Sequence, residues 1–244
     1  MPHSAFANIL RMALYLGTSG WGYPSWKPDF YPKEVKSKDF LRHYATLMNS
    51  TEVNYTFRRH LTEKVIEGWL ADTPETFRFV LKANQYLTHI KRLKDTDESL
   101  KRFVLSIEPM ANSRRMGPVF FQLPPNFKAD VGRLREFLSA LPKVRTAWEF
   151  RHESWFSEET YKALADFDAA LCIAENEEME TPEVHPASHS YFRFRKPLYD
   201  KAELEKIAGK LKELGVGREV YAFFKHEEDP QSATWAIDVR KMAQ

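Results

Sequence analysis

Eight short runs of β-branched and aromatic residues alternate along the chain with longer segments, and this alternation restricts the fold more than any other feature. In the longer segments apolar residues recur every three or four positions, as at Val131, Leu134 and Leu138, which is typical of amphipathic helices. Strands that alternate with helices form parallel sheets, because each helix returns the chain to the edge where the next strand begins. The strand-like runs are residues 13–18, 50–54, 76–82, 117–123, 145–151, 169–174, 190–195 and 218–225.

Eight such units in 244 residues predict one α/β domain, a single (β/α)8 barrel of the TIM type. An open doubly wound sheet is the alternative, but no Gly-x-Gly-x-x-Gly turn follows the first strand. Residues 175–188 are acidic and interrupted by proline, so we expect an incomplete or irregular crossover after the sixth strand. We expect residues 1–12 to be a poorly ordered N-terminal extension and residues 13–244 to form the barrel domain.

The composition argues against several classes of protein. A single cysteine, Cys172, cannot support a disulfide scaffold or a clustered-thiolate metal site, and it favours a reducing, cytoplasmic location. No apolar run approaches the roughly 18 residues of a membrane span, and the opening residues lack a signal-peptide core, so we expect neither membrane association nor secretion. The formal charge of +2 neither indicates nor excludes a local basic patch, and nothing indicates the oligomeric state.

Alternate residues of a barrel strand face the helices and the barrel axis, so the two sets are expected to differ in polarity. One set is apolar and predicts packing beneath the helices: Val53, Phe79, Leu81, Phe121, Leu123, Trp148, Phe150, Phe192, Phe194 and Phe224. The opposite set is polar: Glu52, Asn54, Arg78, Lys82, Gln122, Glu149, Arg151, Arg193, Arg195 and Lys225.

Cations outnumber carboxylates at the C-terminal ends of these strands. Five of the inward residues there are Lys or Arg, against Glu149 and Glu52. Barrel active sites lie at this end, and clustered Lys and Arg suit phosphate or carboxylate groups. The sequence therefore predicts a small phosphorylated or carboxylated ligand, with sugar-like compounds among the candidates.

The segment Glu149-Phe150-Arg151-His152-Glu153-Ser154-Trp155 is the densest polar cluster. An ionised Glu149 beside cations suits a general base, and His152 suits a general acid near neutral pH. The competing interpretation is a salt bridge from Glu149 to Arg151 or Lys82. Lys82 suits a phosphate contact, a Schiff-base amine or an ion-pair partner, which the sequence leaves open. The candidate catalytic residues are thus Glu149, His152 and Lys82.

Residues that follow other strands are candidate substrate contacts. Gly17 begins a small-residue turn whose amides can approach an anion, although a simple tight turn explains it equally well. Trp21, in the loop after it, suits stacking on a sugar or base, and core packing explains it about as well. The candidate binding residues are Gly17, Trp21, Asn54, His89, Gln122, Arg151, Trp155, Arg193, Arg195 and Lys225.

We expect no cofactor and no metal ion. Glu149, His152, His89, His226 and Glu227 have suitable ligand atoms, but they form no His-x-x-x-His or paired-Asp spacing. The basic surroundings also disfavour a bound cation.

Five motifs in order resemble those of the domain of unknown function 72 family, the YecE-like proteins. The resemblance extends from about Leu14 to Ala236 and implies a TIM-type barrel with a pocket at the strand ends, but no established activity. The motifs are Gly17-Thr18-Ser19-Gly20-Trp21, Thr51-Glu52-Val53-Asn54-Tyr55-Thr56-Phe57, Phe79-Val80-Leu81-Lys82-Ala83 with Thr88-His89, Gln122-Leu123-Pro124-Pro125, and Glu149-Phe150-Arg151-His152-Glu153-Ser154-Trp155.

Two segments depart from the family pattern. The chain has Arg193-Phe194-Arg195-Lys196 where the family usually carries Arg-x-His-Gly. It has Lys225-His226-Glu227 where an Asn-Asn-Asp-like run is usual. Because both changes alter the charge at the strand ends, a ligand of the family need not bind here.

Three hypotheses remain open. The first is an enzyme for a small anionic substrate, in which the Lys and Arg side chains hold the anion while Glu149 and His152 transfer protons. The second is a nucleic-acid-binding or processing protein that uses the same basic groove with Trp21, Trp26 and Trp155 as stacking surfaces. The third is a non-catalytic barrel whose charges form an internal ion-pair network.

Overall fold

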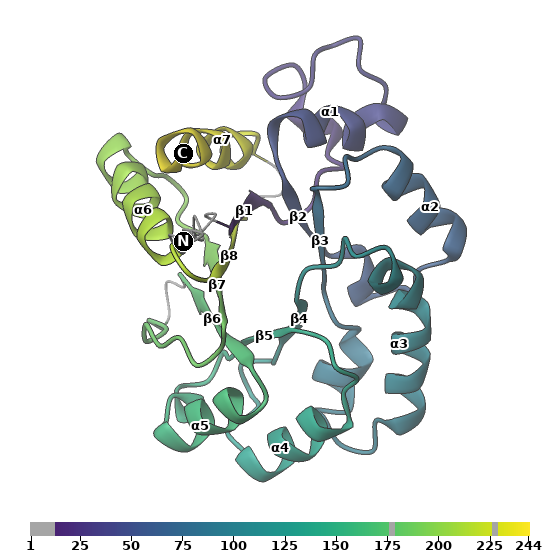
Figure 1. Cartoon of the computed structure of the whole chain (residues 1–244), viewed down its shortest axis with the longest axis vertical. Helices are drawn as coiled ribbons and strands as arrows, with labels where there is room; N and C mark the ends of the chain where they lie inside the picture. The colour runs from purple at the N-terminus through teal and green to yellow at the C-terminus, as the bar shows by residue number, and fades with distance from the viewer. Residues whose placement is uncertain (1–12, 176–178, 226–228) are drawn as a thin grey trace, which may run out of the picture.

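A curled sheet of parallel strands lies at the centre of the molecule and helices surround it (Figure 1). The computed structural model describes residues 13–175, 179–225 and 229–244. The expected N-terminal extension, together with His226 and Glu227, lies outside the described residues. The strands are β1 (Ala13–Thr18), β2 (Ser50–Val53), β3 (Arg78–Leu81), β4 (Val119–Gln122), β5 (Thr146–Glu149), β6 (Ala169–Ala174), β7 (His189–Phe194) and β8 (Glu219–Phe224).

The strands pair in the order β1-β8-β7-β6-β5-β4, with β2 and β3 forming a second parallel pair. Two isolated bridges join the β3 segment to the β4 segment. Phe79 pairs with Met116, just before β4, and Lys82, just after β3, pairs with Phe120. The structure thus shows an α/β fold with a curled parallel sheet and alternating strands and helices.

Side chains connect β1 to β2. The Asn49 side chain accepts a hydrogen bond from the Leu16 N–H (2.8 Å) and donates one to the Leu14 carbonyl (2.7 Å). The Tyr44 hydroxyl accepts one from the Thr18 N–H and donates one to the Ser50 carbonyl. Side-chain hydrogen bonds from Asn49 and Tyr44 thus hold β1 beside β2, where the other neighbouring strands are held by backbone hydrogen bonds.

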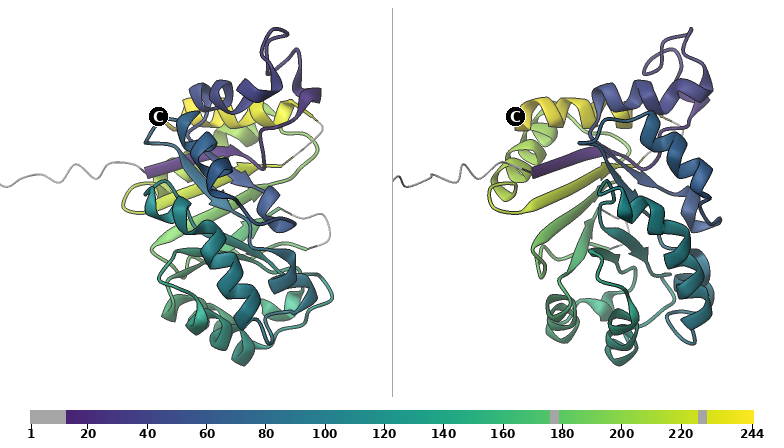
Figure 2. Two further views of the ribbon diagram at one scale, coloured as in Figure 1. Left: turned by 90° about the vertical axis from the view of Figure 1, so that its right-hand side faces the viewer. Right: turned by 45° about the vertical axis from the view of Figure 1, so that its right-hand side comes forward.

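The helices lie outside the sheet (Figure 2). They are α1 (Phe40–Leu47), α2 (Glu63–Ala71), α3 (Asp97–Asn112), α4 (Val131–Ala140), α5 (Glu158–Asp166), α6 (Lys201–Leu214) and α7 (Gln231–Ala243). Helix α6 begins with a capping box, in which the Asp200 side chain accepts from the Glu203 N–H and the Glu203 side chain accepts from the Asp200 N–H. Residues 179–188, between β6 and β7, contain no helix, as the irregular crossover predicts.

The predicted helix-facing set is confirmed, whereas the opposite face is polar only toward the strand ends. All ten residues of the predicted helix-facing set belong to the large buried cluster between sheet and helices. A smaller apolar cluster lies on the opposite side of the strands and includes Val80, Phe120, Cys172, Tyr191 and Phe223. The polar residues at the strand ends therefore adjoin an apolar interior.

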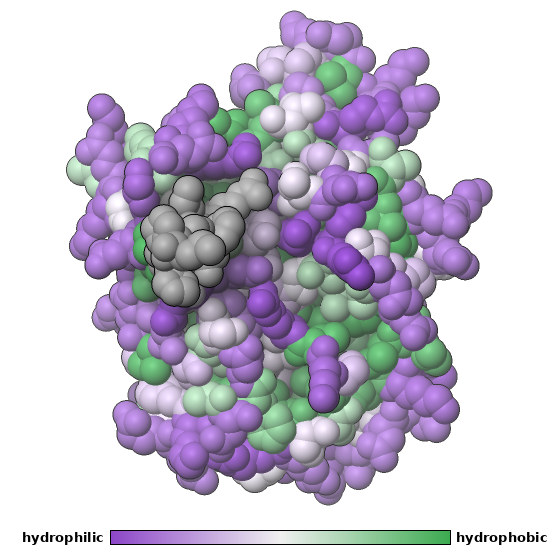
Figure 3. Space-filling model, in the orientation of Figure 1, coloured by the Kyte–Doolittle hydropathy of each residue, from purple (hydrophilic) through white to green (hydrophobic). Residues whose placement is uncertain are grey.

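Figure 3 shows the end of the molecule at which β1 begins, where hydrophilic side chains cover most of the margin. Active sites of such folds lie at the opposite end. Within the described ranges, no helix combines the length and the apolar character needed to cross a membrane.

Candidate functional site at the C-terminal strand ends

Glu149, the last residue of β5, is the centre of a buried charge cluster. Its Oε1 accepts from the Arg151 Nε (2.8 Å) and from the Gln122 amide (3.0 Å). Arg193 bonds its Oε2, and Arg195 reaches both oxygens at 3.1 and 3.0 Å. Burial raises the pKa of this carboxyl, but the charges of Arg193, Arg195 and Arg151 outweigh it and hold the pKa well below its usual range. Glu149 is therefore an anion near neutral pH.

A second carboxylate shares Arg193. Glu52, on β2, accepts from Arg193 (2.8 Å), from the Ser19 hydroxyl (2.9 Å) and from the Tyr191 hydroxyl (2.7 Å). Both Arg193 and Glu52 are completely buried. Burial raises the pKa of Glu52, but Arg193 and Lys82 overcome that effect and lower it. Arg193 thus joins the ends of β2 and β5 from β7.

Lys82, directly after β3, is a buried cation in unusual surroundings. Its Nζ donates to the Gln122 Oε1 (3.1 Å) and lies 4.3 Å from the centre of the Phe57 ring and 5.9 Å from that of Phe120. Among the described residues, no carboxylate oxygen lies within 4.0 Å of this nitrogen. The amine thus has an amide and two aromatic rings in place of a counter-ion.

The pKa of Lys82 is lowered to about 7. Burial is the largest cause, and the charge of Arg193 adds to it, while Glu52 and Glu149 oppose the shift from a distance. A substantial fraction of this amine is therefore neutral near pH 7. Neutral amines can accept protons and can attack electrophilic carbon, which ammonium groups cannot do.

His89 belongs to the same group of residues. Its ring packs edge-on against Phe57, with 5.0 Å between ring centres, and its Nδ1 lies 2.8 Å from the Thr88 hydroxyl. Burial, followed by the charges of Lys82 and Arg151, lowers the pKa of His89. The imidazole is therefore neutral at physiological pH.

Two further candidates lie at neighbouring strand ends. Asn54 follows β2, and its Nδ2 is buried without an acceptor among the described residues. Lys225 follows β8, is half-buried, and is close enough for its charge to lower the pKa of Lys82. The two residues after Lys225, in the segment that departs from the family pattern, lie outside the described residues.

The structure does not bring Trp155 or His152 into this cluster. Trp155 is fully buried, stacks on Phe150, and donates its indole N–H to the Phe127 carbonyl (2.7 Å). It has no free face for a ligand. The His152 Nδ1 accepts from the Ser154 N–H (3.2 Å), which orders the turn after β5.

Gly17 also has a structural position. A Cβ atom at Gly17 would lie 1.9 Å from the Ser50 carbonyl oxygen, so this glycine allows β1 and β2 to approach each other. The next three amides bond within the protein, to Tyr44, Phe224 and Thr18, and offer no cradle to an anion. The half-buried Trp21 packs edge-on against Trp69 of α2.

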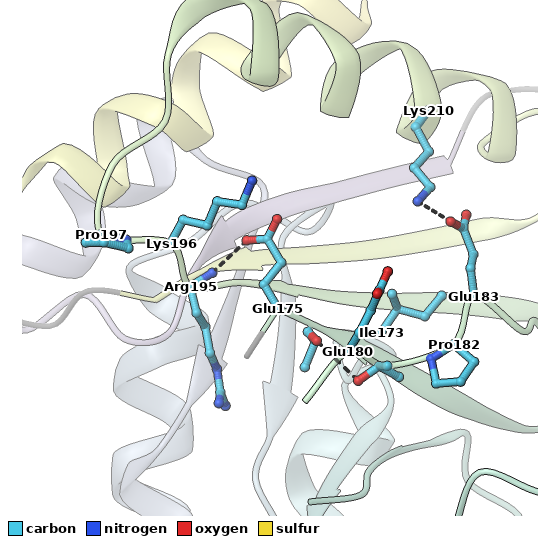
Figure 4. A pocket seen from close by; sticks show the side chains of 11 residues that line it. Ile173, Glu175, Glu180, Pro182, Glu183, Arg195, Lys196, Pro197 and Lys210 are labelled. Carbon is cyan, nitrogen blue, oxygen red and sulfur yellow. Dashed lines mark hydrogen bonds and ion pairs between the residues drawn. The ribbon is translucent and has the colours of Figure 1, made fainter. Parts of the chain in front are cut away.

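A cavity of about 790 Å³ adjoins the cluster between the end of β7 and α6 (Figure 4). Arg195 forms part of its wall, and its guanidinium extends away from the neighbouring Lys196 (Figure 4). The Glu175 carboxylate accepts from the Arg195 N–H (3.1 Å), and Lys210 of α6 pairs with Glu183 across the cavity. The lining is of mixed charge.

The described residues offer no metal site. Nowhere in them do three His, Cys, Asp or Glu side chains come close enough together to hold an ion. The carboxylates of the cluster are instead bonded to arginines.

The family model "Protein of unknown function DUF72" matches residues 15–244. The chain belongs to the DUF72 family. Among curated proteins, it is 31% identical over 161 residues to the UPF0759 protein YunF of Bacillus subtilis, a match that covers 63% of this chain and 56% of YunF. The match to the UPF0759 protein YecE of Escherichia coli K12 is 28% over 146 residues and covers 59% and 50%. The chain thus spans about half the length of the curated relatives it matches.

Solved structures extend this similarity to nearly the whole fold. A DUF72 family protein from Thermotoga maritima superimposes with a TM-score of 0.84 at 28% identity, covering 94% of this chain and 98% of that one. One from Enterococcus faecalis gives 0.81 at 16% identity, covering 94% and 95%. A GH18 chitinase from Pseudoalteromonas aurantia gives 0.50 at 8% identity, covering 93% and 99%, a likeness of fold alone.

The sequence interpretation missed several residues of the site. Tyr191 bonds Glu52, and Phe57 and Phe120 enclose the amine of Lys82. Tyr191 lies two positions before Arg193 on β7, so the two side chains point to the same face of the strand. The alternation of side chains along β7 could therefore have identified Tyr191. Phe57 lies in the short helix after β2 (Tyr55–Phe57), where no periodicity points to it.

Proposed function

We propose that this DUF72 protein is an enzyme that binds a small carboxylate or phosphate compound at the C-terminal strand ends and uses Lys82 as its reactive amine. One observation carries the proposal: Lys82 is buried next to Arg193 with a neutral amide and aromatic rings around it, and no carboxylate of the described residues lies within 4.0 Å. Burial of an unpaired ammonium costs free energy, so a site that maintains it has a use for the neutral form.

Glu149 is less suited to the proton transfer that its sequence motif suggests. A carboxylate that accepts hydrogen bonds from three arginines is a weak base, because protonation would leave those guanidinium groups without their anion. In the proposed site Glu149 positions the arginines, and the Lys82 amine is the group that accepts a proton from the substrate or donates one to it.

Arg151 provides the contact for the substrate anion. Only its Nε is bonded to a described residue, and 27% of its side chain is exposed, whereas Arg193 is fully buried. The remaining N–H groups of the Arg151 guanidinium can bind a carboxylate or phosphate in bidentate geometry.

The proposal includes a closed (β/α)8 barrel and a reducing, cytoplasmic compartment. The bridges between β3 and β4 and the Asn49 and Tyr44 hydrogen bonds between β1 and β2 support the closure. The one cysteine, Cys172, is buried and unpaired, which suits a reducing compartment.

A thermal-shift experiment tests the anion site. Inorganic phosphate, lactate and pyruvate are each compared with chloride at equal ionic strength, using the wild type, Arg151→Met, and Arg135→Met as a control on the outer helices. We expect at least one of these anions to raise the melting temperature of the wild type and of the control, and to have no effect on Arg151→Met. Fold loss is not expected in Arg151→Met, because Glu149 retains Arg193 and Arg195.

If no anion stabilises the wild type, the proposed function is wrong. If a single-stranded oligonucleotide stabilises it instead, with an effect that falls steeply with salt, the nucleic-acid hypothesis replaces it.

A further inference from the structure

The Gln122 side chain fixes the direction of the hydrogen bond to Lys82. Its amide nitrogen donates to Glu149, which is ionised and can only accept. The amide oxygen must then face the Lys82 Nζ, and it accepts one amine hydrogen at 3.1 Å. This leaves the lone pair of a neutral amine directed away from Gln122.

The exposure of the side chains increases from the interior toward the strand ends. Arg193 is 0% exposed, Lys82 7%, and the side chains of Arg195 and Arg151 16% and 27%. The exposed part of Lys82 is where a small molecule held by its anionic end at Arg151 would meet the amine. The aromatic rings of Phe57 and Phe120 exclude water from the amine.

Among the described residues, the amine contacts none of the groups that would hold it as a permanent ion pair. A lysine that served only to bind phosphate would gain from full charge, and a nearby carboxylate would secure that charge. The arrangement around Lys82 has the opposite effect, because burial and Arg193 both favour the neutral amine. Neutral, desolvated lysines are the form that attacks carbonyl carbon.

We propose that Lys82 forms an imine with the carbonyl group of a small acid that carries a ketone or aldehyde, a 2-oxo acid being the simplest case. This inference rests on the proposed function, since the acid group of the substrate binds the same arginine.

The step is balanced without an oxidant or a reductant. The Nζ lone pair adds to the carbonyl carbon, so that a C–N bond forms and the C=O bond opens to a carbinolamine. The two amine hydrogens then leave with the oxygen as one molecule of water, and a C=N bond remains. A protonated imine would be a cation of the same charge as the ammonium, which Glu52 and Glu149 favour from a distance.

Reductive trapping tests the inference on the full chain. The protein is incubated with pyruvate and sodium cyanoborohydride, which reduces imines, and the modified lysines are mapped by peptide mass spectrometry. We expect Lys82 to be modified first, by the mass of one pyruvate less one oxygen atom, ahead of exposed lysines such as Lys201. Lys82→Arg and Lys82→Met should lose this adduct, and Lys201→Met should retain it.

The pH dependence separates a buried amine from an ordinary one. Nα-acetyl-lysine, with a pKa of about 10.4, serves as an internal standard in the same tube, so the pH dependence of the reagent cancels. Because the Lys82 amine is already largely neutral at pH 8, its rate relative to the standard should fall about tenfold between pH 6 and pH 8.

Each outcome decides the imine or the anion site separately. If Lys82 stays unmodified while exposed lysines react, the imine is wrong, whether or not lactate stabilises the fold. If pyruvate and uncharged acetone label Lys82 equally well, and Arg151→Met changes neither rate, the imine stands and the anion site fails. A ratio to the standard that does not change with pH would contradict the neutral amine, and the imine proposal with it. Because the adduct is mapped on the wild type, the test does not depend on whether the Lys82 variants fold.

Discussion

Replacing Lys82 by methionine should stabilise the protein, and the gain should depend on pH. The pKa of Lys82 falls from 10.5 to about 7 on folding. At about 1.4 kcal/mol for each pH unit, keeping this ammonium buried costs the native state on the order of 5 kcal/mol below pH 7. Methionine has a similar length and carries no charge. The amide oxygen of Gln122 loses its donor in the variant, which takes back roughly 1 kcal/mol. We therefore expect a net gain of a few kcal/mol at pH 6.

The gain should disappear as the pH rises. Between pH 7 and 10.5 the unfolded wild-type chain binds a proton at Lys82 that the folded protein does not bind, so the wild type becomes more stable across this window. The difference between variant and wild type is thus largest below pH 7 and falls between pH 7 and 10.5, and above this window only the loss of roughly 1 kcal/mol at Gln122 remains, in favour of the wild type. Other titrating groups are common to both chains and cancel.

Urea denaturation at pH 6, 7, 8, 9 and 10 measures this difference, with Lys201→Met, at a side chain that is 82% exposed, as the control. The control should match the wild type at every pH. The reasoning is refuted if the Lys82→Met difference is independent of pH, or if the variant is less stable than the wild type at pH 6.

Three further predictions concern the surroundings of the site. Gly17→Ala should destabilise the fold by about 3 kcal/mol or more in urea denaturation, because the new Cβ would overlap a carbonyl oxygen of β2; an effect near zero would mean that the β1–β2 contact adjusts freely. Arg193→Met should cost about 3–5 kcal/mol at pH 7, since it leaves Glu52 and Glu149 buried together, and the loss should shrink at acid pH as these carboxylates protonate; a loss that is constant with pH would contradict the shared ion pair. Burial raises the pKa of the Cys172 thiol, so a thiol reagent such as 5,5′-dithiobis(2-nitrobenzoic acid) should react with it only at the rate of unfolding, and rapid reaction of the native protein would show that the interior of the curled sheet is open.

Periodicity predicted the α/β fold and which side chains share a face of a strand, and it could not predict the pairing within the candidate site. Alternation along each strand assigned Phe79 to the helices and Lys82, Glu149 and Arg193 to the opposite face, because a strand has only two faces. Which arginine meets which carboxylate depends on side-chain rotamers and on how far apart the strand ends lie, and neither is written in the spacing of residues. Arg193 bonds both Glu52, which lies 141 residues away in sequence, and Glu149, which lies 44 residues away. No local sequence pattern predicts such a contact.

Trp155 shows a different limit. It belongs to the densest polar motif of the chain, and its neighbours Glu149 and Arg151 do enter the cluster. The turn after β5 nevertheless directs the indole into the core, where the Phe127 carbonyl takes its only polar hydrogen. A loop residue has no fixed alternation, so its direction follows from turn geometry that the sequence does not specify.

The enzyme and ion-pair hypotheses describe different parts of one cluster. Glu52 and Glu149 are satisfied by arginines, as a structural network requires, yet among the described residues these two carboxylates do not balance Lys82, Arg151 and Arg193. With Glu175 counted against Arg195, an excess of positive charge remains among these groups of the described residues. A site in this condition has two ways to lower its energy, which are to release a proton or to bind an anion. Lys82 is the group that can release a proton, because arginine does not deprotonate. An anion that binds at Arg151 would then raise the pKa of Lys82, and a carbonyl group on the same molecule would react with the fraction of the amine that remains neutral. The same excess charge therefore accounts for both the ligand class and the reactive form of the lysine.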